Sequence, residues 1–179
     1  MANHHRKFIR SLAAVALVAG IAMAMAPAAD AAPKIVKFEH DYPLGSIVVV
    51  NTQKKLYYVI GNGQALQYSI AIGVKKEQWT GKSFVQSKAV NPSWTPPDRP
   101  GSVVPGGIGN PLGVRALYLG WTLYRIHGTN KPSSIGSAAS NGCFRMLNKD
   151  VIDLYERVHI GAPVFVLETF EEKVAVTSG

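Results

Sequence analysis

A cysteine and a histidine in the second half of the chain have the residue types and surroundings of a nucleophile and its base. Cys143 is the only cysteine, and His127 lies sixteen residues before it. Gly142 removes a side chain just before the sulfur, so a carbonyl group can approach the thiol and backbone N–H groups can point at it. A loop between the two residues is long enough to bring the imidazole within hydrogen-bond reach of the thiol.

The chemistry expected of this pair is acyl transfer. Pairing with an imidazolium ion lowers the pKa of a thiol from about 8.5 to between about 3.5 and 7.5, which gives a thiolate at working pH. We then expect Cys143 to attack a carbonyl group, His127 to act as acid and base, and backbone N–H groups to hold the oxyanion. A free cysteine is more often a small buried side chain, but the glycine and polar neighbours of Cys143 fit a strand interior poorly.

Short strands separated by turn-forming residues are predicted to position this pair. The β-branched, aromatic or otherwise apolar runs lie at residues 47–50, 56–60, 66–72, 84–90, 117–119, 121–127 and 163–167. Asn62-Gly63 favours a hairpin turn between the second and third runs. Strands of this length and spacing are typical of a sandwich or a partly closed barrel. His127 then ends a strand and meets the turn-forming residues 128–130.

One helix and one long loop interrupt the strands. Asn148 is predicted to cap a helix whose apolar residues recur with a helical period up to Val158, and Gly161 breaks it. Residues 91–113 contain six prolines and five glycines. A structureless stretch of more than about 12–15 residues is usually a functional loop or a linker. We interpret it as the wall or lid of a site, with Trp94 either a contact of the site or a hydrophobic plug.

The first 31 residues are predicted to be a secretory signal peptide. Three positive residues lie within positions 1–10, residues 12–26 carry no charge, and small residues at positions 29 and 31 fit cleavage before Ala32. An uncleaved membrane anchor is the alternative, but an apolar run of about 15 residues is short for a span of about 20. No stable membrane span is expected after cleavage.

The composition fits one exported domain with an anionic partner. The chain has 179 residues, 47% of them hydrophobic and 17% charged, which excludes a disordered chain. One cysteine excludes an intrachain disulfide, a Cys-rich zinc module and an iron–sulfur cluster. Without the signal peptide the net charge is +6, which suits an anionic membrane surface or an anionic polymer such as cell wall. No nucleic-acid partner is expected, because no nucleic-acid motif and no run of five basic residues is present.

The residues around the cysteine and the histidine resemble the YkuD-type L,D-transpeptidase catalytic domain. The motifs that carry the resemblance are Asn110-Pro111-Leu112-Gly113, Ile126-His127-Gly128-Thr129-Asn130, Ser134-Ile135-Gly136, Ser140-x-Gly142-Cys143-x-Arg145-Met146 and Asp150-x-x-Asp153-Leu154-Tyr155. The resemblance implies a mainly β fold, a sandwich of mixed sheets with one or two short helices and a long Pro/Gly-rich loop. It divides the chain into a signal peptide (1–31), an N-terminal linker (32–43), a catalytic domain (44–168) and a C-terminal tail (169–179).

The resemblance also implies an activity, that of a periplasmic L,D-transpeptidase, free or associated with peptidoglycan. Members of the family attack the carbonyl of a diamino acid in a peptidoglycan tetrapeptide stem and release the terminal D-alanine. They pass the acyl group to an amine of another stem, giving a 3→3 cross-link, or to an amine of a wall-anchored protein, such as one of the outer membrane. No metal and no organic cofactor are implied, and carbapenems acylate the family.

The resemblance assigns a role to each motif residue. Cys143 is the nucleophile, His127 the proton donor and acceptor, and Gly128 the residue whose carbonyl orients the ring, while Gly142 serves the oxyanion. The substrate-binding candidates are Arg145, Asn141, Ser140, Thr129 and Trp94. Arg145 either holds a carboxylate or ties down its own loop. Asn141 stands where the commonest family motif has histidine, so substrate positioning and rate are expected to depart from the family there.

Three other functions remain open on the sequence. A hydrolase of the same fold, either an L,D-carboxypeptidase or an amidase that detaches wall-linked protein, differs only in using water as the acceptor. A sortase-like enzyme also uses Cys, His and Arg, but its arginine is expected on a separate strand, whereas Arg145 follows two residues after Cys143. A non-catalytic module that binds the wall through its basic surface is the third.

Overall fold

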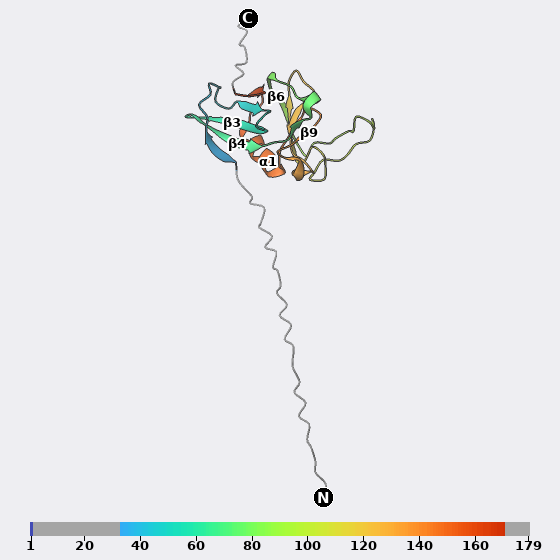
Figure 1. Cartoon of the computed structure of the whole chain (residues 1–179). Helices are drawn as coiled ribbons and strands as arrows, with labels where there is room; N and C mark the ends of the chain where they lie inside the picture. The colour runs from blue at the N-terminus through green and yellow to red at the C-terminus, as the bar shows by residue number, and fades with distance from the viewer. Residues whose placement is uncertain (2–32, 171–179) are drawn as a thin grey trace. The chain divides into compact units, whose positions relative to one another are not determined.

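Strands make up most of the regular structure, as the sequence predicted (Figure 1). This computed structural model describes Met1 and residues 33–170, so the predicted signal peptide, apart from Met1, and residues 171–179 of the tail lie outside the described residues. Nine of the described strands form one mixed sheet in the order β1-β4-β3-β2-β11-β6-β7-β8-β10, and β5 pairs with β9. The strands are β1 (Lys34–Lys37), β2 (Ile47–Val50), β3 (Lys55–Gly61), β4 (Gln64–Ser69), β5 (Ile72–Gly73), β6 (Gly81–Val90), β7 (Arg115–Leu119), β8 (Arg125–His127), β9 (Ala138–Ser140), β10 (Phe144–Arg145) and β11 (Pro163–Leu167).

Strand β6 joins two parts of the large sheet. Its first residues pair with β11 and its later residues with β7, both antiparallel, and the register shifts between Val85 and Ser87. An irregularity of this kind bends a strand and increases its twist. The part β1-β4-β3-β2-β11 therefore lies on one side of the bend, and the part β7-β8-β10 lies on the other.

The four residues of β2 show why this apolar run lies in the middle of the sheet. Ile47 and Val49 pack in the larger hydrophobic cluster, and Val48 and Val50 pack in a second cluster on the opposite face, all fully buried. Side chains of a strand alternate between faces, so only a strand covered on both sides can be apolar at every position. The second cluster also contains Phe38.

Three predictions of where strands lie are wrong, two of them because of contacts with distant segments. The run 66–72 leaves the sheet after Ser69, because Ala71 exchanges two backbone hydrogen bonds of 2.9 Å with Arg145 and the chain continues into β5. Only residues 125–127 of the run 121–127 form a strand, since Trp121 has a φ of 61° and begins a turn. Residues 34–37, expected in a linker, form β1 against β4.

The single helix of the described residues, α1 (Asn148–Arg157), begins differently from the prediction. Leu147 is the N-cap, without a side-chain capping bond, so the prediction of Asn148 in that role was wrong. The Asn148 amide oxygen instead accepts backbone N–H groups of Thr129 at 3.1 Å and Val114 at 3.4 Å. The apolar face of α1 packs in the larger cluster with residues of β7 and β8.

Two short 3₁₀ turns, η1 (Lys75–Glu77) and η2 (Pro132–Ser134), and the loop over residues 91–113 complete this part of the chain. The loop is held by its own contacts. Trp94 and Val104 exchange backbone hydrogen bonds of 3.0 and 2.8 Å, and the Asn110 amide donates to the carbonyls of Val104 and Pro105. In Figure 1 it extends from the sheet on the side away from β3 and β4.

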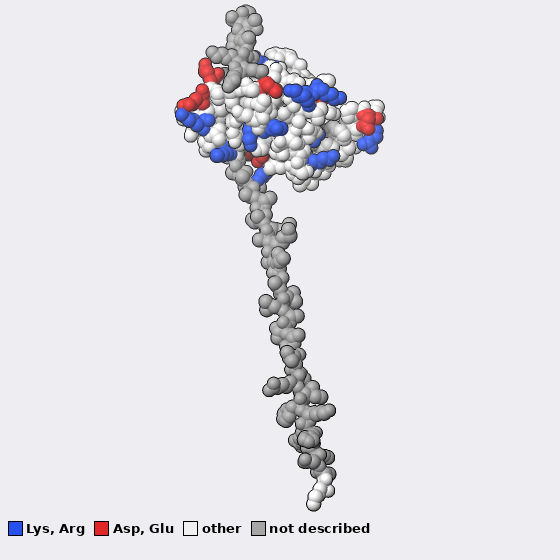
Figure 2. Space-filling view, in the orientation of Figure 1, with Lys and Arg blue, Asp and Glu red and all other residues white. Residues whose placement is uncertain are grey.

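The surface that can be seen carries dispersed charge. On the face drawn in Figure 2, basic side chains occur singly or in small groups among uncharged atoms, without one continuous basic patch. Within residues 33–170, no helix is long and apolar enough to cross a bilayer.

A lysine of β6 caps the end of α1 and gives a test of the fold. Lys88 Nζ donates to the carbonyls of Tyr155 at 2.5 Å and Val158 at 2.7 Å. A cation bound to the last carbonyls of a helix is favourable, and hydrogen bonds to charged groups contribute about 1.5–3 kcal/mol. We expect Lys88→Met to lower the free energy of unfolding in urea by about 2 kcal/mol. The control Lys82→Met, at an exposed position of the same strand, is expected to change it little; equal losses would contradict the capping role.

Candidate active site

Strands β8 and β10 place the histidine and the cysteine on one face of the sheet. The two strands are parallel, with Phe144 level with Ile126 and Arg145 level with His127. Ile126 and Phe144 are buried in the larger cluster. Because side chains alternate along a strand, the neighbours of these two residues project from the opposite face. Those neighbours are Arg125, His127, Cys143 and Arg145.

The four side chains open into one pocket of about 340 Å³. Cys143, which directly precedes β10, is half-buried and is the free thiol of this pocket. Part of the wall comes from the loop over residues 91–113. The lining residues are Trp94, Pro97, Pro111, Leu112, Leu123, Tyr124, Arg125, His127, Ser140, Asn141, Cys143 and Arg145. A thiol, an imidazole and two guanidinium groups therefore share one cavity.

A backbone carbonyl fixes the tautomer of His127. Its Nδ1 lies 2.6 Å from the carbonyl oxygen of Gly128, and the side chain is only 4% exposed. A carbonyl oxygen can only accept a hydrogen bond, so Nδ1 carries the proton and Nε2 keeps its lone pair. The ring is thereby prepared to take a proton at Nε2.

Burial lowers the pKa of His127 to about 4. Backbone hydrogen bonds with Gly128 and Leu112 oppose this shift, and the positive charges of Arg145 and Arg125 add to it. The imidazole is therefore neutral at neutral pH. The imidazolium–thiolate pair expected from the sequence is not favoured here, because desolvation disfavours the charged ring.

Asn148 holds the peptide group that orients His127. The carbonyl of the Gly128–Thr129 peptide faces Nδ1, and the N–H of the same peptide donates to Asn148 Oδ1 at 3.1 Å. In a trans peptide these two groups point in opposite directions, so fixing the N–H also fixes the carbonyl. A Cβ atom on Gly128 would lie 2.2 Å from that same oxygen, so a side chain at this position would break the arrangement.

Trp79 holds the peptide group before Cys143 in a similar way. Its indole N–H donates to the carbonyl of Gly142 at 3.1 Å, and its ring stacks on Tyr124 with centroids 5.3 Å apart. Gly142 has a φ of +96°, and a Cβ there would lie 2.2 Å from the Tyr124 ring. The Ser140 hydroxyl donates to the carbonyl of Cys143 at 2.5 Å. These contacts fix the backbone on both sides of the thiol.

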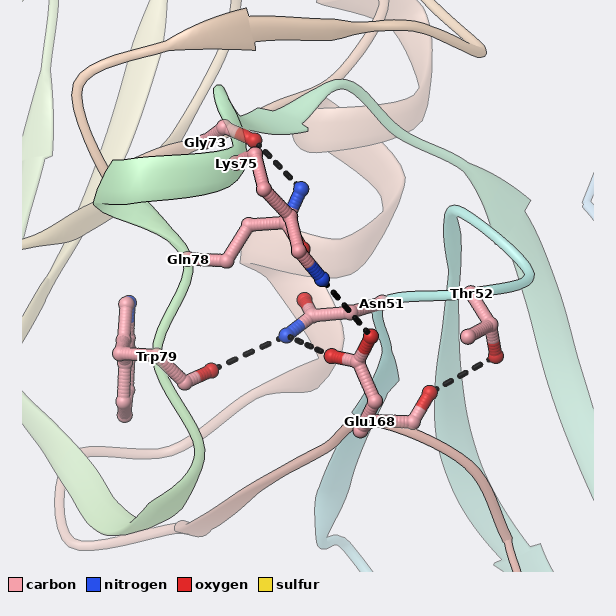
Figure 3. A network of polar contacts seen from close by, with 7 residues as sticks. All are labelled: Asn51, Thr52, Gly73, Lys75, Gln78, Trp79 and Glu168. Carbon is pink, nitrogen blue, oxygen red and sulfur yellow. Dashed lines mark hydrogen bonds and ion pairs between the residues drawn. The ribbon is translucent and has the colours of Figure 1, made fainter.

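Trp79 is itself anchored from the far part of the sheet (Figure 3). The buried Asn51 side chain donates to the Trp79 carbonyl at 3.0 Å, and the indole points away from this contact. Glu168 accepts a hydrogen bond from the Asn51 amide at 3.5 Å and forms an ion pair with Lys75 at 3.9 Å. The Thr52 hydroxyl donates to the Glu168 carbonyl, and the Gln78 amide donates to the Gly73 carbonyl. The network connects the end of β11 to the loop that carries Cys143.

Six of the nine site residues predicted from the sequence line the pocket, and Thr129, Gly128 and Gly142 do not. Thr129 is 4% exposed and lies outside the lining, where its hydroxyl accepts the N–H of Lys131. Gly128 and Gly142 contribute through their backbone rather than as lining residues. Sequence reasoning missed Arg125, although its place two residues before His127 in a strand predicts the same face. It also missed Trp79, for which no motif gave a signal.

Comparisons with known proteins identify the family of this chain. Residues 45–166 match the YkuD family, described as the L,D-transpeptidase catalytic domain. The chain is similar to the "Probable L,D-transpeptidase YbiS" of Escherichia coli (strain K12), with 35% identity over 148 residues that cover 74% of this chain and 46% of that protein. It is 33% identical to YqjB of Bacillus subtilis (strain 168) over 147 residues, covering 75% of this chain and 80% of that one. The chain thus spans about half the length of YbiS and most of YqjB.

Solved structures share the fold at low sequence identity. A mutant L,D-transpeptidase of Enterococcus faecium superposes with a TM-score of 0.58 at 18% identity, covering 70% of this chain and 50% of that one. L,D-transpeptidase 3 from Mycobacterium tuberculosis, in complex with a faropenem-derived adduct, gives 0.56 at 19% identity, covering 70% and 61%. The sandwich of mixed sheets expected from the sequence is the fold of these domains. On the match over residues 45–166 and the identity to YqjB, the chain belongs to the YkuD family of L,D-transpeptidase catalytic domains.

Proposed function

We propose that this protein is an L,D-transpeptidase of the periplasm that transfers a peptidoglycan stem peptide through a thioester on Cys143. The observation that carries the proposal is the pocket shared by a half-buried thiol and a neutral, oriented imidazole, in a chain of this family. The signal peptide predicted over residues 1–31 supports export. The proposed substrate is the tetrapeptide stem, and the acceptor is an amine of another stem or of a wall-anchored protein.

The first half-reaction uses the tautomer of His127. As Sγ of Cys143 attacks the carbonyl of the stem diamino acid, Nε2 takes the thiol proton and the ring becomes an imidazolium. The tetrahedral intermediate collapses when this imidazolium gives its proton to the amine of the departing D-alanine, which leaves a thioester. Because the charged ring is disfavoured by burial, the proton is readily returned.

The second half-reaction repeats these steps with an amine. The acceptor nitrogen attacks the thioester, His127 takes a proton from it, and the thiolate leaves and is reprotonated by the imidazolium. The acyl group then forms an amide with the acceptor. If water reaches the thioester first, the same site hydrolyses the stem, which is the carboxypeptidase or amidase alternative.

The backbone N–H of Cys143 is the proposed donor to the oxyanion. It belongs to the peptide whose carbonyl accepts the Trp79 indole N–H, so it points away from Trp79. A donor that is fixed before the reaction stabilises developing charge without reorganisation. Arg145 and Asn141, which line the pocket, are proposed to bind the stem, and Trp94 to bind it from the loop. Ser140 and Thr129 act through the backbone contacts of their loops.

The test of the function is the thiol itself. Cys143→Ala is expected to abolish both the covalent carbapenem adduct, measured by intact-mass spectrometry, and turnover of tetrapeptide stems, because no second thiol is present. The wild type is expected to gain one adduct and to form cross-linked dimers or amine-exchanged stems. Release of D-alanine without either product would identify a hydrolase, and activity that survives in the variant would exclude the proposed mechanism.

The low pKa of His127 predicts an unusual pH profile. The base is neutral above about pH 4, so acylation by a carbapenem should change less than twofold between pH 7 and pH 5 and decline with a midpoint near 4. For a histidine with the ordinary pKa of about 6.5, the neutral fraction would fall about twenty-five-fold over that range. The rate constant is measured by mass spectrometry, with circular dichroism to show that the protein stays folded. A midpoint between pH 6 and 6.5 would contradict the buried neutral ring.

Trp79→Phe separates the hydrogen bond to Gly142 from the ring stack. Phenylalanine keeps an aromatic face for Tyr124 but cannot donate, so the oxyanion donor is held less firmly. We expect kcat for stem transfer to fall about tenfold, with KM nearly unchanged. This loss is smaller than the loss of about 10²–10³-fold that follows when such a donor is deleted, because the N–H of Cys143 is still present. Trp121→Phe, at an exposed position outside this pocket, is the matched control. An unchanged kcat for Trp79→Phe would show that the contact does not serve the reaction.

A further inference from the structure

The charge of the pocket is not explained by the acyl-transfer residues. Two of its lining side chains, Arg125 and Arg145, carry guanidinium groups that stay protonated, and no Asp or Glu lines it. His127 is neutral, so the cavity has two fixed positive charges. Arg145 belongs to the family motif, but Arg125 has no assigned role.

Arg125 has weak contacts of its own. Its guanidinium lies over the Tyr118 ring at 5.2 Å, one nitrogen donates to the Leu123 carbonyl at 3.4 Å, and Nε is buried without a hydrogen-bond partner. Neither Arg125 nor Arg145 forms an ion pair within residues 33–170. A half-buried guanidinium with unused donors is costly, and a carboxylate that binds it in a bidentate manner offsets that cost.

The strand register tells where such a carboxylate would lie. Arg145 is level with His127, and the same register extended by one residue before the Phe144–Ile126 pair places Cys143 beside Arg125. The two levels are about 6.6 Å apart along the strands. His127 protonates the leaving D-alanine, so the leaving group and its C-terminal carboxylate belong on the level of Arg145. Arg125 then faces the part of the substrate that stays on the sulfur.

We propose that Arg125 is a specificity-determining residue that binds a free carboxylate on the side chain of the acylating residue. This inference rests on the proposed function. The preferred donor is a stem whose diamino acid carries a second carboxyl group on its side chain, and this distal group is ionised. A donor with that group amidated keeps the size and the stereochemistry but loses the charge that a guanidinium recognises.

The experiment compares two tetrapeptide donors that differ only in this group, the free carboxylate and the primary amide. For the wild type, kcat/KM is expected to be about tenfold or more higher for the free carboxylate, as for a lost charge-assisted hydrogen bond. Arg125→Gln is expected to lower kcat/KM for the free carboxylate to the level of the amide and to leave the amide donor nearly unchanged. Arg125→Lys, which keeps the charge without the fork, is expected to retain part of the preference.

Arg115→Gln is the matched control. Arg115 lies on the neighbouring strand β7 on the face of α1, with its guanidinium 5.3 Å from the Tyr155 ring, and it does not line the pocket. The Arg115→Gln variant removes one positive charge, as Arg125→Gln does, and should leave the preference between the two donors unchanged. Circular dichroism shows whether each variant is folded. The comparison of the two donors with the wild-type protein tests the inference even if a variant does not fold.

The outcomes separate this inference from the function on which it rests. Equal wild-type rates for the two donors overturn the inference and leave the transpeptidase intact. Equal losses on both donors in Arg125→Gln also overturn it, because they assign the arginine to the C-terminal carboxylate that both donors share. Absence of turnover of both donors by the wild type overturns the inference together with the proposed function.

Discussion

The hydrogen bond between His127 Nδ1 and the Gly128 carbonyl is the interaction on which the rest of the site depends. The ring is only 4% exposed, and the fixed acceptor at Nδ1 sets its tautomer and its orientation. The carbonyl belongs to the residue next to the histidine, so it can move away from the ring only if the backbone conformation at the end of β8 changes. Sheet pairing on both sides, to β7 and to β10, prevents such a change. The base is therefore positioned by the same backbone that builds the sheet.

Side chains from distant parts of the chain then hold single peptide groups of the backbone. Asn148 at the start of α1 fixes the Gly128–Thr129 peptide, and Trp79 before β6 fixes the Gly142–Cys143 peptide. Neither glycine has space for a Cβ. On Gly128 it would meet the Asn148 side-chain oxygen, and on Gly142 it would meet the Tyr124 ring. A peptide group has one donor and one acceptor pointing apart, so one contact at either end orients the other. The close approach of these side chains to the backbone explains why both positions are glycine. The polar side chains Asn148 and Trp79 are needed because each fixes the direction of one peptide group.

The sequence predicted what depends on local pattern, and it missed what depends on contacts between distant segments. The apolar run at 47–50 predicted a strand, and the Gly142-Cys143 and His127-Gly128 pairs indicated the reactive residues. Each of these signals comes from residues that are adjacent in the sequence. The role of Asn148 was misassigned, since an asparagine before a helix usually caps it, and here its oxygen is used by residues nineteen and more positions earlier. Strand β1 was missed because only its partner β4 makes residues 34–37 a strand. No sequence pattern singled out Trp79, because the carbonyl to which its indole N–H donates lies 63 residues later in the chain.

A backbone carbonyl, rather than a carboxylate, as the partner of His127 is consistent with the charge of this pocket. A carboxylate at Nδ1 would favour the imidazolium and raise the pKa of the ring, which would leave less neutral base at a given pH. It would also lie close to Arg125 and Arg145, the two cations whose charges act on His127, and would pair with them. A peptide carbonyl orients the ring with a partial charge only, so both guanidinium groups stay available to an anionic substrate. Burial keeps the ring neutral, and a carbonyl acceptor orients it without the full negative charge that would raise its pKa or pair with the two guanidinium groups.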